Sequence, residues 1–304
     1  MKTCQERYGV DYPCFLPQAR VASNDSSPNR KFAEMLTDNG VEFEREFPIG
    51  KFQYDFKVGN ILLEINPSPT HNSTWGLFNK KGLIPTYHKN KSETAKENGF
   101  RCIHIWDWDN FEKIIKLLCS KNTIYARKCS VVEISLNDTE RFLDTYHLQG
   151  YAPSKINIAL ESGGEIVSLM TFGEPRYNKN YESELIRYCS NSKVIGGAEK
   201  LFKYFVTKYS PKSIISYCDK SKFTGDVYER LGFCLLRDGM PSKHWYNIKN
   251  RTHITDNLLR QRGFDQLFGT SYGKGTSNEE LMLQNGFVEI YDFCFREGDT
   301  LPYM

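Results

Sequence analysis

The spacing of apolar residues predicts a first group of elements between residues 28 and 127. Phe32 and Leu36 lie four positions apart in SPNRKFAEMLTDNG, which predicts a helix that Ser27 caps and Gly40 ends. Alternating aromatic residues in FQYDFKV, a Gly-Asn turn and the apolar run ILLEI predict a β-hairpin. A helix over KSETAKENG, a buried strand FRCIHIW and an amphipathic helix DNFEKIIKLLCSKN follow. This order is typical of a small α/β module.

From Ser130 the pattern changes to a longer alternation of strands and helices, ending in the strand KHWYNIK near residue 249. It predicts a second α/β domain with a mixed sheet. The rest of the chain contains an acidic helix around Asn278–Leu283 and a strand GFVEIYDF. We therefore expect an α/β (α+β) chain with four segments: 1–27, 28–129, 130–249 and 250–304.

Composition narrows the class of protein. The 304 residues suit about two domains, and no apolar run approaches the ~18 residues that cross a bilayer, so no membrane partner is expected. The N-terminus lacks the apolar core of a signal peptide. Nine scattered cysteines, an odd number, favour a reducing cytoplasm over a disulfide framework. The net charge of +3 excludes a strongly basic tail but leaves room for a basic face.

Carboxylates gather at the predicted hairpin. Asp55 lies in its first strand, and Glu64 and Asn66 lie at the end of its second. Pairing across the turn sets Asp55 opposite Glu64, so the two side chains could share a divalent cation, Mg²⁺ or Mn²⁺. Hydrolysis of a phosphodiester needs such a cation, a base that activates water and positive charge near the phosphate. His71 and Lys91 are suitable groups for the last two roles.

Other polar residues flank this site. Glu34 comes from the first helix, His88 opens the helix before Lys91, and Asp107 and Asp109 follow the strand FRCIHIW. His104 alternates with isoleucines in that strand, which predicts a core histidine with satisfied hydrogen bonds.

The hairpin pattern D-x8-E-x-N resembles the PD-(D/E)xK nuclease core, with Asn66 in place of its lysine. That departure leaves the cationic role to Lys57, Lys91 or a histidine. The strings INPSPTHNS, YHKNKS and HIWDWD more closely resemble the EDxHD homing endonucleases of bacteriophages, relatives of the very short patch repair endonuclease. The resemblance covers about residues 28–115 and implies a metal-dependent DNA endonuclease of a phage-infected bacterium.

Matching the motif letters implies the following roles. Glu34 is the E, Asp55 the D and main metal ligand, and His71 the H, acting as base or as partner of the scissile phosphate. The x falls at Glu64 or Asn66, and the final D at Asp107 or Asp109. The structural zinc site of the repair enzyme has no matching set of cysteines and histidines in this sequence.

Double-stranded DNA is the partner that this resemblance implies. Between residues 79 and 101 the chain has six basic and two acidic residues, which suits phosphate contacts as well as an ordinary solvated surface. The segment TCQERYGVDYP resembles the short YGV-x-x-P modules of phage homing endonucleases, which are associated with DNA binding. The candidate DNA-binding residues are Lys80, Lys81, Lys89, Lys96 and Arg101.

The second domain resembles the GNAT acyltransferase superfamily. The loop Lys193-Val-Ile-Gly-Gly-Ala198 lies between a strand and a helix, where backbone N–H groups can hold a pyrophosphate. YERLGF, beginning at Tyr228, follows one strand later. The strings SLMTFG, ELIRYC and VIGGAEKLFKYF resemble a domain that accompanies several nucleases of phages. The resemblance implies an acetyl-CoA site at Lys193, Gly196, Gly197, Ala198 and Tyr228, or a retained fold used as a scaffold.

Three functions therefore compete. The first is a homing endonuclease in which the GNAT-like domain lacks essential chemistry. The second is an N-acyltransferase whose first domain binds nucleic acid. The third is a DNA-binding protein without catalysis. The cluster around Asp55 and His71 favours the first function, and the pairing of the glycine loop with Tyr228 favours the second.

Overall fold

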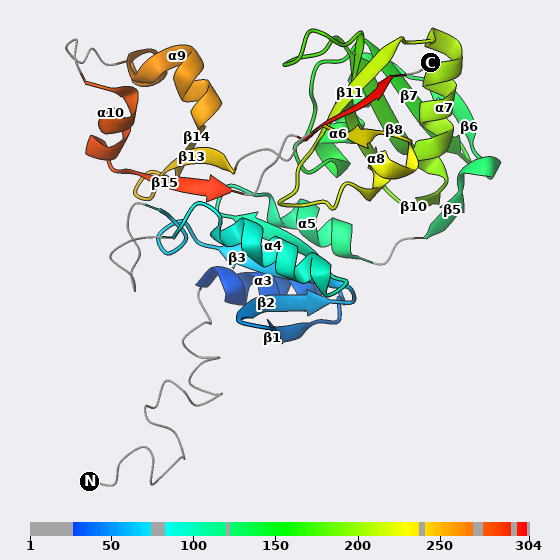
Figure 1. Ribbon diagram of the computed structural model, residues 1–304. Helices are drawn as coiled ribbons and strands as arrows, with labels where there is room; N and C mark the ends of the chain where they lie inside the picture. Colours follow the sequence, from blue (N-terminus) through cyan, green and yellow to red (C-terminus); the bar gives the residue numbers. More distant parts are fainter. Residues whose placement is uncertain are drawn as a thin grey trace, which may run out of the picture.

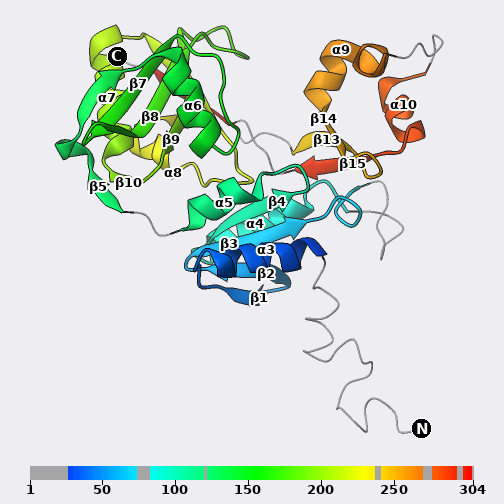
Figure 2. The same ribbon diagram turned by 180° about the vertical axis from the view of Figure 1, so that it is seen from behind.

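A computed structural model of the chain describes residues 27–73, 83–119, 122–236, 241–269, 276–292 and 297–302. The elements form three units (Figure 1). The first unit, residues 27–118, lies at the bottom of the view, the second at the upper right and the third, residues 242–292, at the upper left (Figure 1). Seen from behind, the second and third units again lie on the same side of the first (Figure 2).

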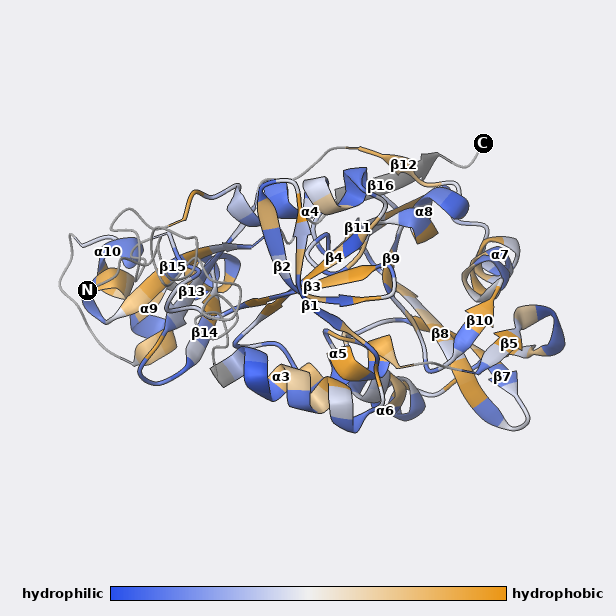
Figure 3. Ribbon diagram, turned by 90° about the horizontal axis from the view of Figure 1, so that it is seen from below, coloured by the Kyte–Doolittle hydropathy of each residue, from blue (hydrophilic) through white to orange (hydrophobic). Residues whose placement is uncertain are grey.

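The first unit is a four-stranded sheet in the order β1-β2-β3-β4, with β3 and β4 parallel. Its elements are α3 (Ser27–Asp38), β1 (Glu44–Ile49), β2 (Phe52–Val58), β3 (Ile61–Asn66), α4 (Tyr87–Glu97), β4 (Arg101–Trp106) and α5 (Phe111–Leu118). Helices α3 and α5 cover one face of the sheet and α4 the other (Figure 3). Alternation along β3 sends Leu63 and Ile65 to the α3 side and Leu62 and Glu64 to the α4 side.

The hairpin has the predicted turn and register. β2 and β3 pair as Phe56↔Leu63, Lys57↔Leu62 and Val58↔Ile61, and the same register continued by one residue sets Asp55 against Glu64. The predicted alternation in β2 would place Tyr54 and Phe56 on the same face of the sheet, but an irregularity at Asp55 places them on opposite faces. Tyr54 packs in the core beneath α4, whereas Phe56 packs against α3, and the ladder with β1 skips Asp55.

The second unit is built on a seven-stranded sheet in the order β12-β16-β11-β9-β8-β7-β6. Alternate residues of β7 send Ile158 and Leu160 toward α7 and Ala159 toward α6, so helices cover both faces. The elements are β5 (Thr123–Tyr125), the 3₁₀ helix η2 (Ala126–Lys128), β6 (Ser130–Glu133), α6 (Leu136–Tyr146), β7 (Ile156–Ser162), β8 (Glu165–Gly173), β9 (Ser183–Ser190), β10 (Lys193–Ile195), α7 (Gly197–Tyr209), β11 (Ser213–Cys218), α8 (Asp226–Arg230), β12 (Cys234–Leu235) and β16 (Glu297–Pro302).

The third unit differs from the sequence-based division of the chain. The strand KHWYNIK does form, but it pairs with β14 and β15 in a separate three-stranded sheet and does not join the second unit. Strand β16, from the far end of the chain, joins the second unit instead. The elements of the third unit are β13 (Ser242–Asn247), β14 (Thr252–Thr255), α9 (Asp256–Phe268), α10 (Asn278–Gln284) and β15 (Phe287–Asp292). Helix α10 and strand β15 were predicted, and α9 was not.

Both other units contact the first at the end of its sheet. The N–H of His104, on edge strand β4, donates to the carbonyl of Ser221 at 2.9 Å. Lys222 is buried at this junction, donates to the His104 carbonyl and pairs with Asp109 at 2.5 Å. The third unit is tied to the first by Ser73, whose N–H donates to the Glu289 carbonyl at 2.9 Å. Elements far apart in sequence therefore surround the end of β3.

These units confirm the predicted α+β class, with helix and strand in about equal shares. Among the described residues, none of the helices has both the length and the apolar character needed to span a membrane.

Candidate active site

A group of polar side chains, some buried and some half-buried, gathers near the end of β3 and the start of α4, and we call it the polar cluster. Its members are Asp55, Glu64, Asn66, His71, His88 and Lys91. The hairpin supplies the first three residues, the loop after β3 supplies His71, and α4 supplies the other two. The predicted helix over KSETAKENG begins earlier than expected, at Tyr87, and this places His88 and Lys91 on its face toward the sheet.

Asp55 lies at the irregular position of β2, where two donors fix its carboxylate. The backbone N–H of Ile65 donates to Oδ2 at 2.7 Å, and Asn29 Nδ2 donates to Oδ1 at 3.1 Å. Burial nevertheless raises the pKa of Asp55 to about 6, since desolvation outweighs these bonds and the charge of Lys91. The carboxylate is therefore held in a fixed position but is short of positive charge.

Glu64 and Lys91 form a buried ion pair. Lys91 Nζ lies 2.5 Å from Glu64 Oε1, and the two side chains are 6% and 3% exposed. Burial, with the nearby Asp55 charge, raises the pKa of Glu64, whereas the carboxylates raise that of Lys91 against the effect of its own burial. Of the three cationic groups that the sequence left open, Lys91 is the one that pairs with Glu64. Lys57 instead pairs with Glu44 at 2.6 Å.

Three oxygen-bearing side chains of the cluster suit a divalent cation. The charges of Asp55 and Lys91 both act on Glu64, and Asn66 Oδ1 is buried without a hydrogen-bond partner. Within the described ranges, no group of three or more His, Cys, Asp and Glu side chains is arranged to hold a metal. Mg²⁺ binds proteins through one or two carboxylates and takes its other ligands from water and phosphates. The donor set therefore fits Mg²⁺ or Mn²⁺ that shares its shell with a substrate.

Histidines line the other side of the cluster. His71 Nδ1 lies 3.2 Å from His88 Nε2, and His88 Nδ1 lies 3.2 Å from the carbonyl of Tyr291 in the third unit. Burial lowers the pKa of His71 to about 3, with Lys91 adding to the shift, so its ring is neutral at pH 7. His104 is fully buried and hydrogen-bonded to Ser92 and Asn66, as predicted for a core histidine.

The two candidate aspartates after β4 have different partners. Asp107 accepts a hydrogen bond from the N–H of Ser68 at 2.7 Å and another from its hydroxyl, so it holds the start of the loop that carries His71. Asp109 accepts from the N–H of Trp106 at 2.8 Å and pairs with Lys222 of the second unit. Asp107 therefore supports the site, and Asp109 joins two units.

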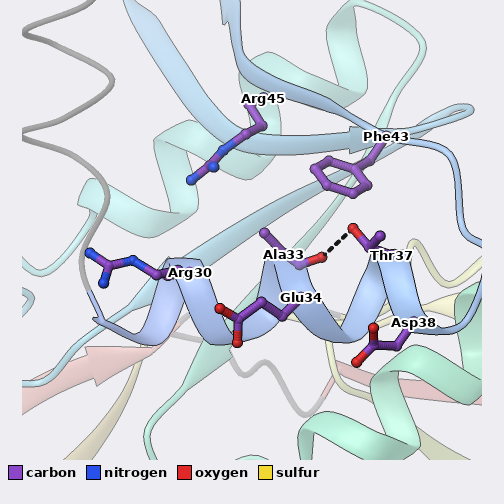
Figure 4. Close-up of a pocket in the computed structure, with 7 residues that line it drawn as sticks. All are labelled: Arg30, Ala33, Glu34, Thr37, Asp38, Phe43 and Arg45. Carbon is purple, nitrogen blue, oxygen red and sulfur yellow. Dashed lines mark hydrogen bonds between the residues drawn. The ribbon is translucent and has the colours of Figure 1, made fainter.

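Glu34 does not reach the polar cluster, contrary to the role that the motif match implied. It is exposed on α3 and lines an open hollow of about 520 Å³ together with Arg30, Phe43 and Arg45 (Figure 4). Asn29, one and a half turns earlier on α3, is the residue that contacts Asp55. No sequence signal points to Asn29, because an asparagine at a helix start is ordinary.

The candidate DNA-binding residues fall into three groups. Lys96 is exposed in the last turn of α4, and Lys89 lies on the same helix, 3.5 Å from Glu93. The side chain of Arg101 is used inside the protein, because its Nε donates to the Lys222 carbonyl at 2.7 Å and its guanidinium covers Phe223. Arg101 therefore joins two units and is not placed to contact DNA. Lys80, Lys81 and the segment 1–26 lie outside the described residues.

The candidate acetyl-CoA site of the second unit is a turn with few polar groups. Gly196 has φ 76° at the start of α7, and a Cβ on Gly197 would lie 3.0 Å from Val194 Cγ1. Lys193 is exposed on β10, which pairs with β5, and Ala198 is buried in the core. The Tyr228 hydroxyl donates to the Tyr217 carbonyl at 3.3 Å. Each residue has a structural role here.

No protein-family model and no curated protein matches this sequence.

Proposed function

We propose that the first unit hydrolyses phosphodiester bonds of double-stranded DNA with the help of Mg²⁺ or Mn²⁺. The observation that carries the proposal is the burial of two carboxylates, Asp55 and Glu64, with one lysine and a neutral histidine beside them. Perturbed pKa values that gather at one place are typical of catalytic sites.

Each group has a role in this proposal. Asp55, Glu64 and the amide oxygen of Asn66 would hold the cation, which when bound supplies positive charge to the phosphate oxygens. Lys91 pairs with Glu64 and offsets part of the cost of burying its charge. It also adds positive charge close to the place where negative charge develops. His71, neutral and half-buried, would accept the proton of the attacking water. Asp107 holds the loop of His71.

The resemblance to phage homing endonucleases supports the same reaction. It implies site-specific cleavage in the cytoplasm of an infected bacterium, with the second unit as an accompanying domain. The alternative, an N-acyltransferase, has less support because the Tyr228 hydroxyl already donates to a carbonyl.

The test is cleavage of phage genomic DNA with Mg²⁺, compared with the same reaction in EDTA. We expect Asp55→Asn to lower cleavage by at least ~10³-fold, because it removes the charge of a direct ligand. Its fold should persist, since asparagine has the same shape and can still accept from the N–H of Ile65. Asp138→Asn, a surface change in the second unit, is the control. Cleavage by Asp55→Asn within tenfold of the unchanged protein would contradict the proposal.

A further inference from the structure

A carbonyl of the third unit determines which nitrogen of His88 carries a proton. A carbonyl oxygen only accepts hydrogen bonds, so the contact of 3.2 Å between His88 Nδ1 and the Tyr291 oxygen requires a proton on Nδ1. His88 is 3% exposed, and the titratable groups that act on it are His71, His104 and Lys91. Because none of these is an acid, a second proton on the ring would be a buried charge without a partner. His88 is therefore neutral, and its Nε2 carries a lone pair.

The same reasoning then applies to His71. His88 Nε2 accepts, so His71 Nδ1, 3.2 Å away, must be the donor and carry the proton. A neutral ring with its proton on Nδ1 has a lone pair on Nε2. Among the described residues, no hydrogen-bond partner is recorded for this second nitrogen. His71 is thus in the tautomer that a base needs at Nε2.

Strand β15 holds the loop of His71 at a second point. The N–H and the hydroxyl of Ser73 both donate to the Glu289 carbonyl at 2.9 Å. β15 is an edge strand of its sheet, and carbonyls two residues apart point the same way from a strand edge. The carbonyls of Glu289 and Tyr291 thus face the first unit together, one at the loop and one at His88.

We propose that the third unit completes the nuclease site by setting the tautomer of His71 through His88. This inference rests on the proposed function in one respect, which is the role of His71 as the base. His88 is a positioning residue, since it acts on the reaction through His71. Strand β15 of the same chain therefore contributes to the nuclease site. In a first unit that lacked β15, we expect His71 to populate both tautomers.

The tautomers can be measured without any cleavage assay. Long-range ¹H–¹⁵N NMR spectra of the full chain labelled with ¹⁵N-histidine distinguish a protonated Nδ1 from a protonated Nε2. We expect both His71 and His88 to be neutral with the proton on Nδ1 at pH 7. A His71 ring with its proton on Nε2 would overturn the proposal, even in a protein that cleaves DNA.

Two substitutions of His88 separate the relay from simple packing. In His88→Gln the amide can donate to the Tyr291 carbonyl and accept from His71, whereas His88→Leu can do neither. We expect His88→Leu to lower kcat by about 10²-fold or more, the usual contribution of a general base, with KM little changed. His88→Gln should stay within about tenfold and keep the Nδ1 proton of His71.

His147→Gln is the matched control, because His147 is a half-buried histidine of the second unit whose pKa is also lowered by desolvation. It should alter neither cleavage nor the tautomer of His71. Equal losses in His88→Gln and His88→Leu with an unchanged His71 spectrum would overturn the relay. If the unchanged protein does not cleave DNA, the proposed function fails, and the spectra still decide the relay.

Discussion

Glu64 in the first unit and Glu184 in the second are both buried carboxylates, yet their surroundings differ. Arg176 satisfies both oxygens of Glu184, because its backbone N–H donates at 2.6 Å and its Nε at 2.8 Å. Glu64 has a single lysine, a second acid beside it and a pKa raised by burial. A paired and fully hydrogen-bonded carboxylate stabilises a loop, whereas a buried carboxylate with a raised pKa is typical of a functional site.

The largest expected effect on stability follows from breaking either of these two ion pairs. Lys91→Met and Arg176→Met should each destabilise the fold by about 3–5 kcal/mol, since each leaves a buried charge without its partner. Adding Glu64→Gln or Glu184→Gln, respectively, should restore much of the lost stability. Urea unfolding measures the free energy of unfolding of each single and double variant.

Cleavage should then distinguish the pairs. The restored Lys91→Met/Glu64→Gln protein should have lost at least ~10³-fold in cleavage, because ligand and cation are both gone. The restored Arg176→Met/Glu184→Gln protein should cleave normally. Normal cleavage by the first double variant would show that Glu64 and Lys91 are structural, like the pair in the second unit.

A smaller effect is expected at the glycine turn of the second unit. Gly197→Val should destabilise the fold by about 1–3 kcal/mol, because the added atoms meet Val194 and the Tyr188 hydroxyl. Tyr228→Phe should cost about 1 kcal/mol for one lost hydrogen bond and leave DNA cleavage unchanged. Calorimetry with acetyl-CoA tests whether the second unit binds this cofactor. Micromolar binding with acetyl transfer that Tyr228→Phe abolishes would give this unit a chemistry of its own.

The smallest effect concerns the surface of α4. Lys89→Gln with Lys96→Gln should weaken DNA binding to a similar extent on all sequences, and the slope of log K against log salt should fall by up to ~2, about one per lost phosphate contact. Lys91 stays unchanged in this test, because it is buried in the site. Lys203→Gln on the exposed face of α7 is the control. An unchanged slope would place the DNA-binding face elsewhere.

Much of the first unit could be predicted from local pattern. The hairpin register follows from turn position and strand period, and it correctly set Asp55 against Glu64. Glu34 and Arg101 were misplaced, because a motif match gives the type and order of residues but not the direction of a side chain. Asn29 carried no signal, since its contact with Asp55 depends on how α3 packs across the sheet. The strand KHWYNIK was assigned to the wrong sheet, because strand pattern does not specify the partner strand.

The sequence by itself determined most of the elements of the first unit, the class of fold and the kinds of groups at the site, because turn residues, hydrophobic period and chemistry are local properties of the chain. Only the tertiary structure decided that Lys91 pairs with Glu64, that burial shifts the pKa of Asp55 and His71, and that Tyr291 lies against His88. These outcomes depend on distance and desolvation between residues up to 203 positions apart, and both arise only when the elements of the chain pack together.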